Sequence, residues 1–133
     1  MRRPRFGGLS TGRLWIAAGA LVGLGTVAMS AYAAHGLASA EPAAQVMVRD
    51  AVQIQGWHAL ALLFCGLWRE RAGRLADVAG LAFLVGLIAF CGGVYAIALF
   101  GIRLPDVAPT GGTLLMLGWL LLFLSALRSG HNR

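Results

Sequence analysis

The stretch VAGLAFLVGLIAFCGGVYAIALFGI, residues 78–102, decides the fold, because it runs for 25 residues without one charged side chain. A helix rises about 1.5 Å per residue, so a stretch of this length can cross the roughly 30 Å hydrocarbon core of a bilayer. The stretch does not alternate between polar and apolar residues, as a strand of a membrane barrel would. A single pass through lipid must also satisfy its own backbone hydrogen bonds. The stretch therefore predicts a transmembrane α-helix.

Three further apolar stretches can form membrane helices, at residues 14–34, 52–68 and 110–127. The whole chain is 59% hydrophobic and only 12% charged, with a mean hydropathy of +0.76. Soluble domains contain about 25% charged residues, so this chain lacks the surface that water requires. We predict an all-α integral membrane protein, a four-helix bundle of up-down topology that occupies residues 14–127 in the lipid bilayer.

Arginine placement predicts how the bundle is oriented. The chain has 11 basic residues, and nine of them fall in the N-terminal arm, the second connection and the tail: Arg2, Arg3, Arg5, Arg13, Arg69, Arg71, Arg74, Arg128 and Arg133. The first and third connections hold only Arg49 and Arg103. Basic residues concentrate on the cytoplasmic side of membrane proteins, so the arm (1–13) and the tail (128–133) are expected to be cytoplasmic. The arginines end apolar runs and form no stripe, which argues against nucleic acid as a partner despite the net charge of +6.

Two tryptophans, Trp15 and Trp68, are expected at the inner interface of the membrane, and Trp57 at the outer one. The first apolar stretch also has an alternative interpretation. A basic arm, an apolar run and small residues at 38–40 describe a cleavable signal peptide as well. The run is longer than the usual 7–15 residues of a signal core, which favours a retained helix.

The first connection leaves the start of the second helix open, and the third connection is expected not to be helical. Asp50 followed by Gln53 has the form of a capping box that would start the second helix, whereas one long helix from Pro42 to Trp68 is the alternative. The third connection, 101–110, contains two prolines and is expected to be extended or turning rather than helical.

Small residues predict close helix packing. In the first apolar stretch Gly19, Gly23, Thr26, Ser30 and Ala34 recur at intervals of three and four and share one helix face. Such a face lets a neighbouring helix approach closely, in this bundle, in a second copy or in another membrane protein. Glycine is abundant in the whole chain, so chance spacing is the alternative. The other candidate packing residues are Gly92, Gly93, Gly111 and Gly112.

Five uncharged polar residues could carry chemistry: His35, Gln55, His58, Tyr95 and Thr110. The four predicted spans contain no Asp, Glu, Lys or Arg, which argues against an ion-coupled carrier. The up-down topology brings the five residues to a similar depth in the outer leaflet. They could bind a quinone or lipid headgroup, or haem through two histidines, or simply form hydrogen bonds between helices.

No motif in the sequence predicts an enzyme. Ser-His-Asp, HExxH and paired-carboxylate patterns are absent, so we expect no catalytic residue, no cofactor and no metal. The two cysteines, Cys65 and Cys91, fall at different depths of two spans and are expected to be packing residues rather than a disulfide.

Short motifs resemble a known family. They are Ala33-Ala34-His35-Gly36-Leu37, Gln55-x-x-His58-Ala59-Leu60, Gly92-Gly93-x-Tyr95, Ala108-Pro109-x-Gly111-Gly112 and Gly118-Trp119. In this order they resemble the YgdD-like family of small bacterial inner-membrane proteins, a family defined as a domain of unknown function. The resemblance implies a four-helix inner-membrane protein and adds no biochemical activity. Cys91-Gly92-Gly93 departs from the family, which more often has Ser-Gly-Ser there.

The leading functional hypothesis is a non-enzymatic membrane component that packs with a partner or stabilises a membrane complex. The alternative is a small binding or transport module for a lipid, a quinone or another apolar ligand, built on the polar cluster. A cavity lined by His35, His58 and Tyr95 would favour the alternative, and a solid core would favour the leading hypothesis.

Overall fold

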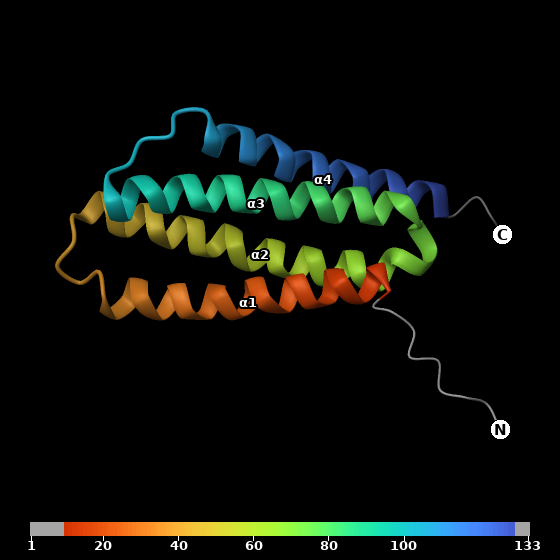
Figure 1. Cartoon of the computed structure of the whole chain (residues 1–133), viewed down its shortest axis with the longest axis horizontal. Coiled ribbons are helices and arrows are strands. Elements are labelled where there is room, and N and C mark those ends of the chain that lie inside the picture. The colour runs from red at the N-terminus through yellow and green to blue at the C-terminus, as the bar shows by residue number, and fades with distance from the viewer. Residues whose placement is uncertain (1–9, 130–133) are drawn as a thin grey trace, which may run out of the picture.

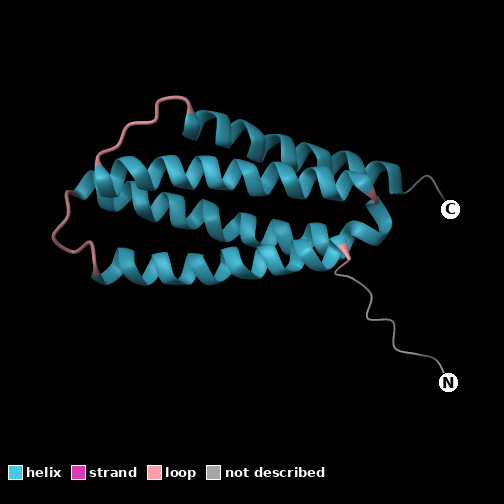
Figure 2. Cartoon of the chain, viewed as in Figure 1, coloured by secondary structure: helices cyan, strands magenta, loops and turns pink. Residues whose placement is uncertain are grey.

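The computed structural model describes residues 10–129, and within that range it consists of helices without a strand (Figure 2). The four helices are α1 (Thr11–His35), α2 (Pro42–Ala72), α3 (Arg74–Phe100) and α4 (Val107–Ser129). Each is long and apolar enough to cross a membrane. The predicted all-α class with four membrane-spanning helices is confirmed.

The helices lie side by side and are joined alternately at opposite ends of the bundle (Figure 1). α2 and α3 occupy the centre, with α1 packed on α2 and α4 packed on α3. The contacts of α2 with α4 and of α1 with α3 are smaller, and α1 does not meet α4 within the described residues. As a result α1 is a peripheral helix with one main neighbour.

The orientation of the bundle in the membrane stays a prediction from the arginine count. Arg2, Arg3, Arg5 and Arg133, which belong to the expected basic arm and tail, lie outside the described residues. α1 begins and α4 ends at the same end of the bundle (Figure 1).

α2 is longer than its apolar core, which corrects the expected capping box. It begins at Pro42 with Glu41 as its N-cap, so Asp50 lies inside the helix and caps nothing. The alternative of one long helix therefore describes α2. Arg49 and Arg69 are 20 residues apart, about 30 Å along the helix, which matches the hydrocarbon thickness. Trp57 lies about 12 Å along the helix from Arg49 by the same rise, and its place at the outer interface stays a prediction.

The third connection is shorter than expected, since α4 already begins at Val107 and includes Pro109. Proline is tolerated in a first helical turn, where backbone N–H groups have no partner within the helix. Gly101 ends α3 in a left-handed conformation (φ 67°), and its N–H donates to the carbonyl of Ile97. A single residue, Gly73 (φ 59°), joins α2 to α3. Both positions need glycine because side chains disfavour positive φ.

Two glycines bring neighbouring helices into backbone contact. A Cβ atom at Gly19 would lie 2.8 Å from the carbonyl oxygen of Ala59, so α1 and α2 touch there. A Cβ atom at Gly111 would collide with the backbone nitrogen of Phe90 and lie 2.7 Å from the carbonyl oxygen of Gly86. Any larger residue at these positions would force two helices apart.

The remaining candidate packing residues make weaker contacts. A Cβ atom at Gly93 would lie 3.2 Å from Ala108, and one at Gly23 3.9 Å from the side chain of Ala59. Gly112 would reach only a ring atom of Phe90, at 3.7 Å, and Gly92 faces open space. Ser30 is exposed and lines a groove between α1 and α2.

The core forms mainly between the two central helices. Phe83, Leu62 and Cys65 are completely buried in its main cluster, to which α4 contributes Leu115 and Leu122. A smaller cluster of Ala33, Leu37 and Val48 closes the end near the α1–α2 connection. Both cysteines are free and buried.

Candidate functional site: a hydrogen-bonded polar layer

Gln55 connects three helices inside the bundle. Its Oε1 accepts a hydrogen bond of 2.8 Å from the hydroxyl of Tyr95 on α3. Its Nε2 donates to the backbone carbonyl of Val22 on α1, at 3.3 Å. Gln55 is only 9% exposed, so both ends of its amide are occupied by protein groups.

His58, one turn further along α2, uses both ring nitrogens. Nδ1 lies 2.7 Å from the carbonyl oxygen of Ile54, and Nε2 lies 3.0 Å from the indole nitrogen of Trp119. The carbonyl can only accept and the indole can only donate, so the two contacts require a neutral ring with its proton on Nδ1. The phenyl ring of Phe83 packs on this pair, 5.5 Å from the His58 ring and 5.2 Å from the Trp119 ring.

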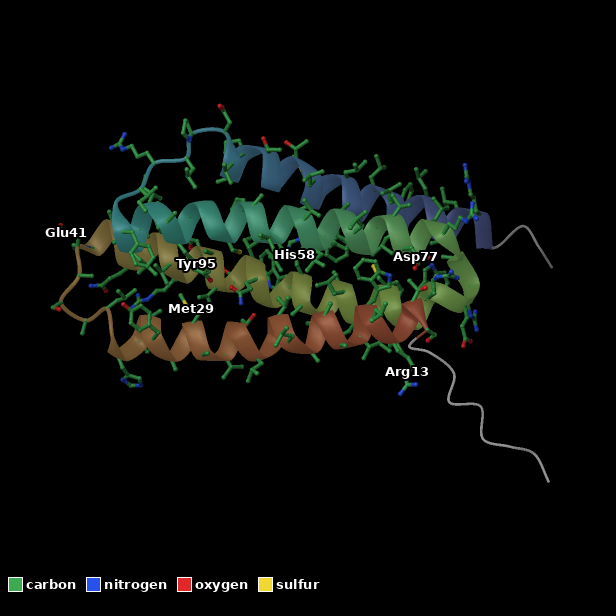
Figure 3. All side chains as sticks on the ribbon, viewed as in Figure 1. Arg13, Met29, Glu41, His58, Asp77 and Tyr95 are labelled. Atoms are coloured by element: carbon green, nitrogen blue, oxygen red, sulfur yellow. The ribbon has the colours of Figure 1, made fainter. Side chains whose placement is uncertain are left out.

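Three of the five predicted site residues therefore come together, in what we call the polar layer: Gln55, His58, Tyr95 and the added Trp119. Figure 3 shows His58 and Tyr95 within the bundle. The other two do not join them. His35 ends α1 and is exposed, and Thr110 is exposed in the first turns of α4.

The arrangement does not supply free ligands. His58 would have to break its bond to Trp119 before Nε2 could bind haem iron, and His35 lies exposed at a helix end. Among residues 10–129 no three His, Cys, Asp or Glu side chains group as they would around a metal ion. The polar layer joins helices, and its groups are already paired.

Similarity to other proteins agrees with this architecture. A family model described as protein of unknown function (DUF423) matches residues 29–112. A UPF0382 membrane protein of Staphylococcus haemolyticus is 33% identical over 118 residues, which cover 87% of this chain and 97% of that protein. The UPF0382 inner membrane protein YgdD of Escherichia coli is 30% identical over 121 residues, 89% of this chain and 92% of its own.

The chain belongs to this family. The resemblance inferred from its motifs is thus confirmed, and the protein is a membrane protein of unknown biochemical activity. A relative in Haemophilus influenzae, 32% identical over 83% of this chain, is also named a membrane protein. No solved structure matches the chain.

The region that matches the family model contains most of the polar layer. Gln55, His58 and Tyr95 lie within it, whereas Trp119 lies beyond its end. Cys91, where the resemblance implied a serine, directs its thiol to the carbonyl oxygen of Ala51, at 3.5 Å. The contact links α2 and α3, and a serine hydroxyl could also donate there.

A second set of polar contacts, not foreseen in the sequence, lies at the end of the bundle where α2 joins α3 (Figure 3). Asp77 accepts from the indole nitrogen of Trp15 at 3.0 Å and pairs with Nε of Arg69 at 2.7 Å. Trp68 donates to the hydroxyl of Ser125 at 2.9 Å. The only sequence signal for this set is the interfacial position of its two tryptophans, since partners on other helices cannot be read from one helix.

Proposed function

We propose that this protein is a non-enzymatic component of the bacterial inner membrane that packs against a further protein in the bilayer, either another membrane protein or a second copy. Both termini face the cytoplasm in this proposal, as the arginine bias indicates. The inner-membrane location is supported by the name of the Escherichia coli relative.

The state of the polar layer favours packing over ligand binding. Gln55 and His58 are buried, and both they and Tyr95 are hydrogen-bonded to other groups of the bundle. A polar group in lipid needs a partner, and these have found theirs between helices. Such bonds stabilise a bundle without leaving a group for chemistry.

The peripheral helix carries the proposal. In the apolar 18-residue segment of α1 only 6% is buried inside the bundle, whereas 44% of the corresponding segment of α2 is buried. Between these two helices lies a groove of about 600 Å³. It is lined by Thr26, Val27, Ser30, Ala31 and Ala34 of α1 and by Val52, Gln53, Gly56 and Trp57 of α2. Membrane helices associate through van der Waals packing and small side chains, because lipid offers no hydrophobic driving force between them. The α1 side of the groove consists mostly of small residues on an exposed helix, which fits a partner helix.

Site-specific photo-crosslinking in the native membrane tests this proposal. Ala31 is exposed in the groove, and its replacement by p-benzoylphenylalanine should give a discrete protein adduct after irradiation. The matched control carries the same probe at Ile88, which is 66% exposed on α3 outside the groove. Mass spectrometry of the adduct distinguishes a second copy from another protein. Lipid adducts alone at both positions would refute the proposal.

A further inference from the structure

A second groove opens between α2 and α4 and differs in chemistry from the first. It encloses about 900 Å³ and its lining is almost wholly apolar. Trp57, Leu60 and Phe64 come from α2, Trp119 and Phe123 from α4, and the buried Ala61 lies between them.

The groove has a fixed wall. Trp119 is held by its hydrogen bond to His58, and its ring meets the Phe83 ring edge-on at 5.2 Å and 69°. The hydrogen bond and the ring contact together hold Trp119 against the wall and out of the space. The groove is therefore preformed, which lowers the entropy cost of filling it.

The groove opens to hydrocarbon. Trp57 and Phe64 lie between Arg49 and Arg69, which mark the two edges of the membrane on α2. Phe64 is five residues from Arg69, about 7–8 Å along the helix. The groove thus extends from near the middle of the bilayer into the leaflet where α2 and α4 end, and only apolar matter surrounds it there.

Its shape suits one hydrocarbon chain better than a helix. Close helix contacts in membranes need small residues at the point of approach. Here the rims carry large side chains, with Leu60 65% exposed, Phe123 60% exposed and Trp57 54% exposed. A helix with its side chains is about 10 Å wide and would rest on these rims, whereas an extended chain can lie between them.

A stacked tryptophan and an arginine lie beyond Phe64, which lines one end of the groove. Phe64 stacks on Trp68 at 5.7 Å, and the guanidinium of Arg71 lies 5.8 Å from the Trp68 ring. Arg69 is paired with Asp77, but Arg71 forms no ion pair among the described residues. Arg71 is exposed and seven residues beyond Phe64, about 10 Å further out, at the depth of lipid phosphates.

We propose that this groove holds one acyl chain of an anionic phospholipid from the leaflet at the C-terminal ends of α2 and α4, with its phosphate at Arg71. Membrane-edge arginines attract anionic lipid, each by an amount that corresponds to about a fivefold preference. The site shares only Trp57 with the α1–α2 groove. Its tests use Arg71, Phe64 and Phe123, which do not line that groove, so it stands or falls independently of the proposed packing function.

Native mass spectrometry of the full chain in mild detergent tests the site. The probe is an equimolar mixture of dioleoyl phosphatidylglycerol and dioleoyl phosphatidylcholine. We expect one phospholipid per chain to resist collisional activation, with phosphatidylglycerol retained about fivefold more than phosphatidylcholine. Arg71→Gln should bring that ratio close to one while a lipid is still retained.

Rim variants separate this site from the general lipid coat. Phe64→Ala with Phe123→Ala should lower retention of both lipids about fivefold or more, since two aromatic contacts are lost. Phe100→Ala is the matched control, because it removes a phenyl group that is 73% exposed outside the groove. Leu60→Ala is a gentler second variant if the double variant does not fold, with an expected loss of about twofold. Equal loss in the rim and control variants, or a second protein chain in place of the lipid, would overturn the proposal.

Discussion

Removal of one hydroxyl group tests whether the polar layer stabilises the bundle. Tyr95→Phe deletes the 2.8 Å bond to Gln55 without changing the ring. Hydrogen bonds between membrane helices contribute about 0.6 kcal/mol on average and up to roughly 1.7 kcal/mol. The change also strands the buried Gln55 amide, so we expect the free energy of unfolding to fall by about 1–2 kcal/mol. Reversible unfolding by sodium dodecyl sulfate in mixed micelles, followed by circular dichroism, measures this value.

A double-mutant cycle with Gln55→Leu tests the Tyr95–Gln55 bond more directly than the single change. Gln55→Leu keeps a similar volume and should cost about 1–2 kcal/mol alone, because it strands the Tyr95 hydroxyl. The double variant leaves neither group stranded, so it should cost no more than the worse single change, a coupling of about 1 kcal/mol. The control is Tyr32→Phe, at the other tyrosine of the chain, which is 45% exposed and has no hydroxyl contact among the described residues. It should change stability by less than about 0.5 kcal/mol. Additive costs, or no loss from Tyr95→Phe, would refute the reasoning.

Three further predictions concern two contacts and the topology. Gly111→Ala should destabilise the bundle by about 1–3 kcal/mol because its methyl group collides with the α3 backbone, whereas Gly92→Ala, which points into open space, should be close to neutral in the same titration. Cys91→Ser should keep the contact to the carbonyl of Ala51 and change stability by less than about 1 kcal/mol, and a larger loss would show that the thiol is needed for packing. Alkaline phosphatase fused after Arg133 should be inactive and a green fluorescent protein fused there should be bright, as a cytoplasmic C-terminus requires, and the reverse pattern would invert the topology.

Hydropathy predicted the number of helices correctly, but it gave no signal for the helical residues beyond the apolar stretches. The spans rest on the absence of charge, and lipid enforces that absence over about 20 residues. α2 continues as a helix before its apolar run, where Pro42 starts it and Arg49 and Asp50 are exposed. A helix in water can carry any side chain, so hydropathy gives no signal for its beginning.

Only part of the polar layer could be predicted, because sequence gives the depth of a residue but not the direction of its side chain. Topology and a rise of 1.5 Å per residue give the depth of each residue in the membrane. They do not give the direction in which a side chain points around the helix axis. His58 and Gln55 point inward, whereas His35, expected in the same layer, lies exposed at a helix end. The direction of a side chain depends on how its helix is rotated about its own axis against its neighbours. Contacts between helices, such as that of Gly111 with α3, set this rotation.

Glycine contacts and hydrogen bonds specify different features of this bundle. Glycines such as Gly19 and Gly111 set how closely helices approach, but a smooth contact allows one helix to slide along another. The polar layer prevents sliding, because a shift of one turn would carry the donor of Tyr95 about 5 Å from the acceptor of Gln55. The His58–Trp119 bond fixes α4 at the same level, and the bond from Gln55 to the Val22 carbonyl fixes α1. A buried, neutral and fully bonded histidine in a membrane protein therefore indicates helix register before it indicates a ligand.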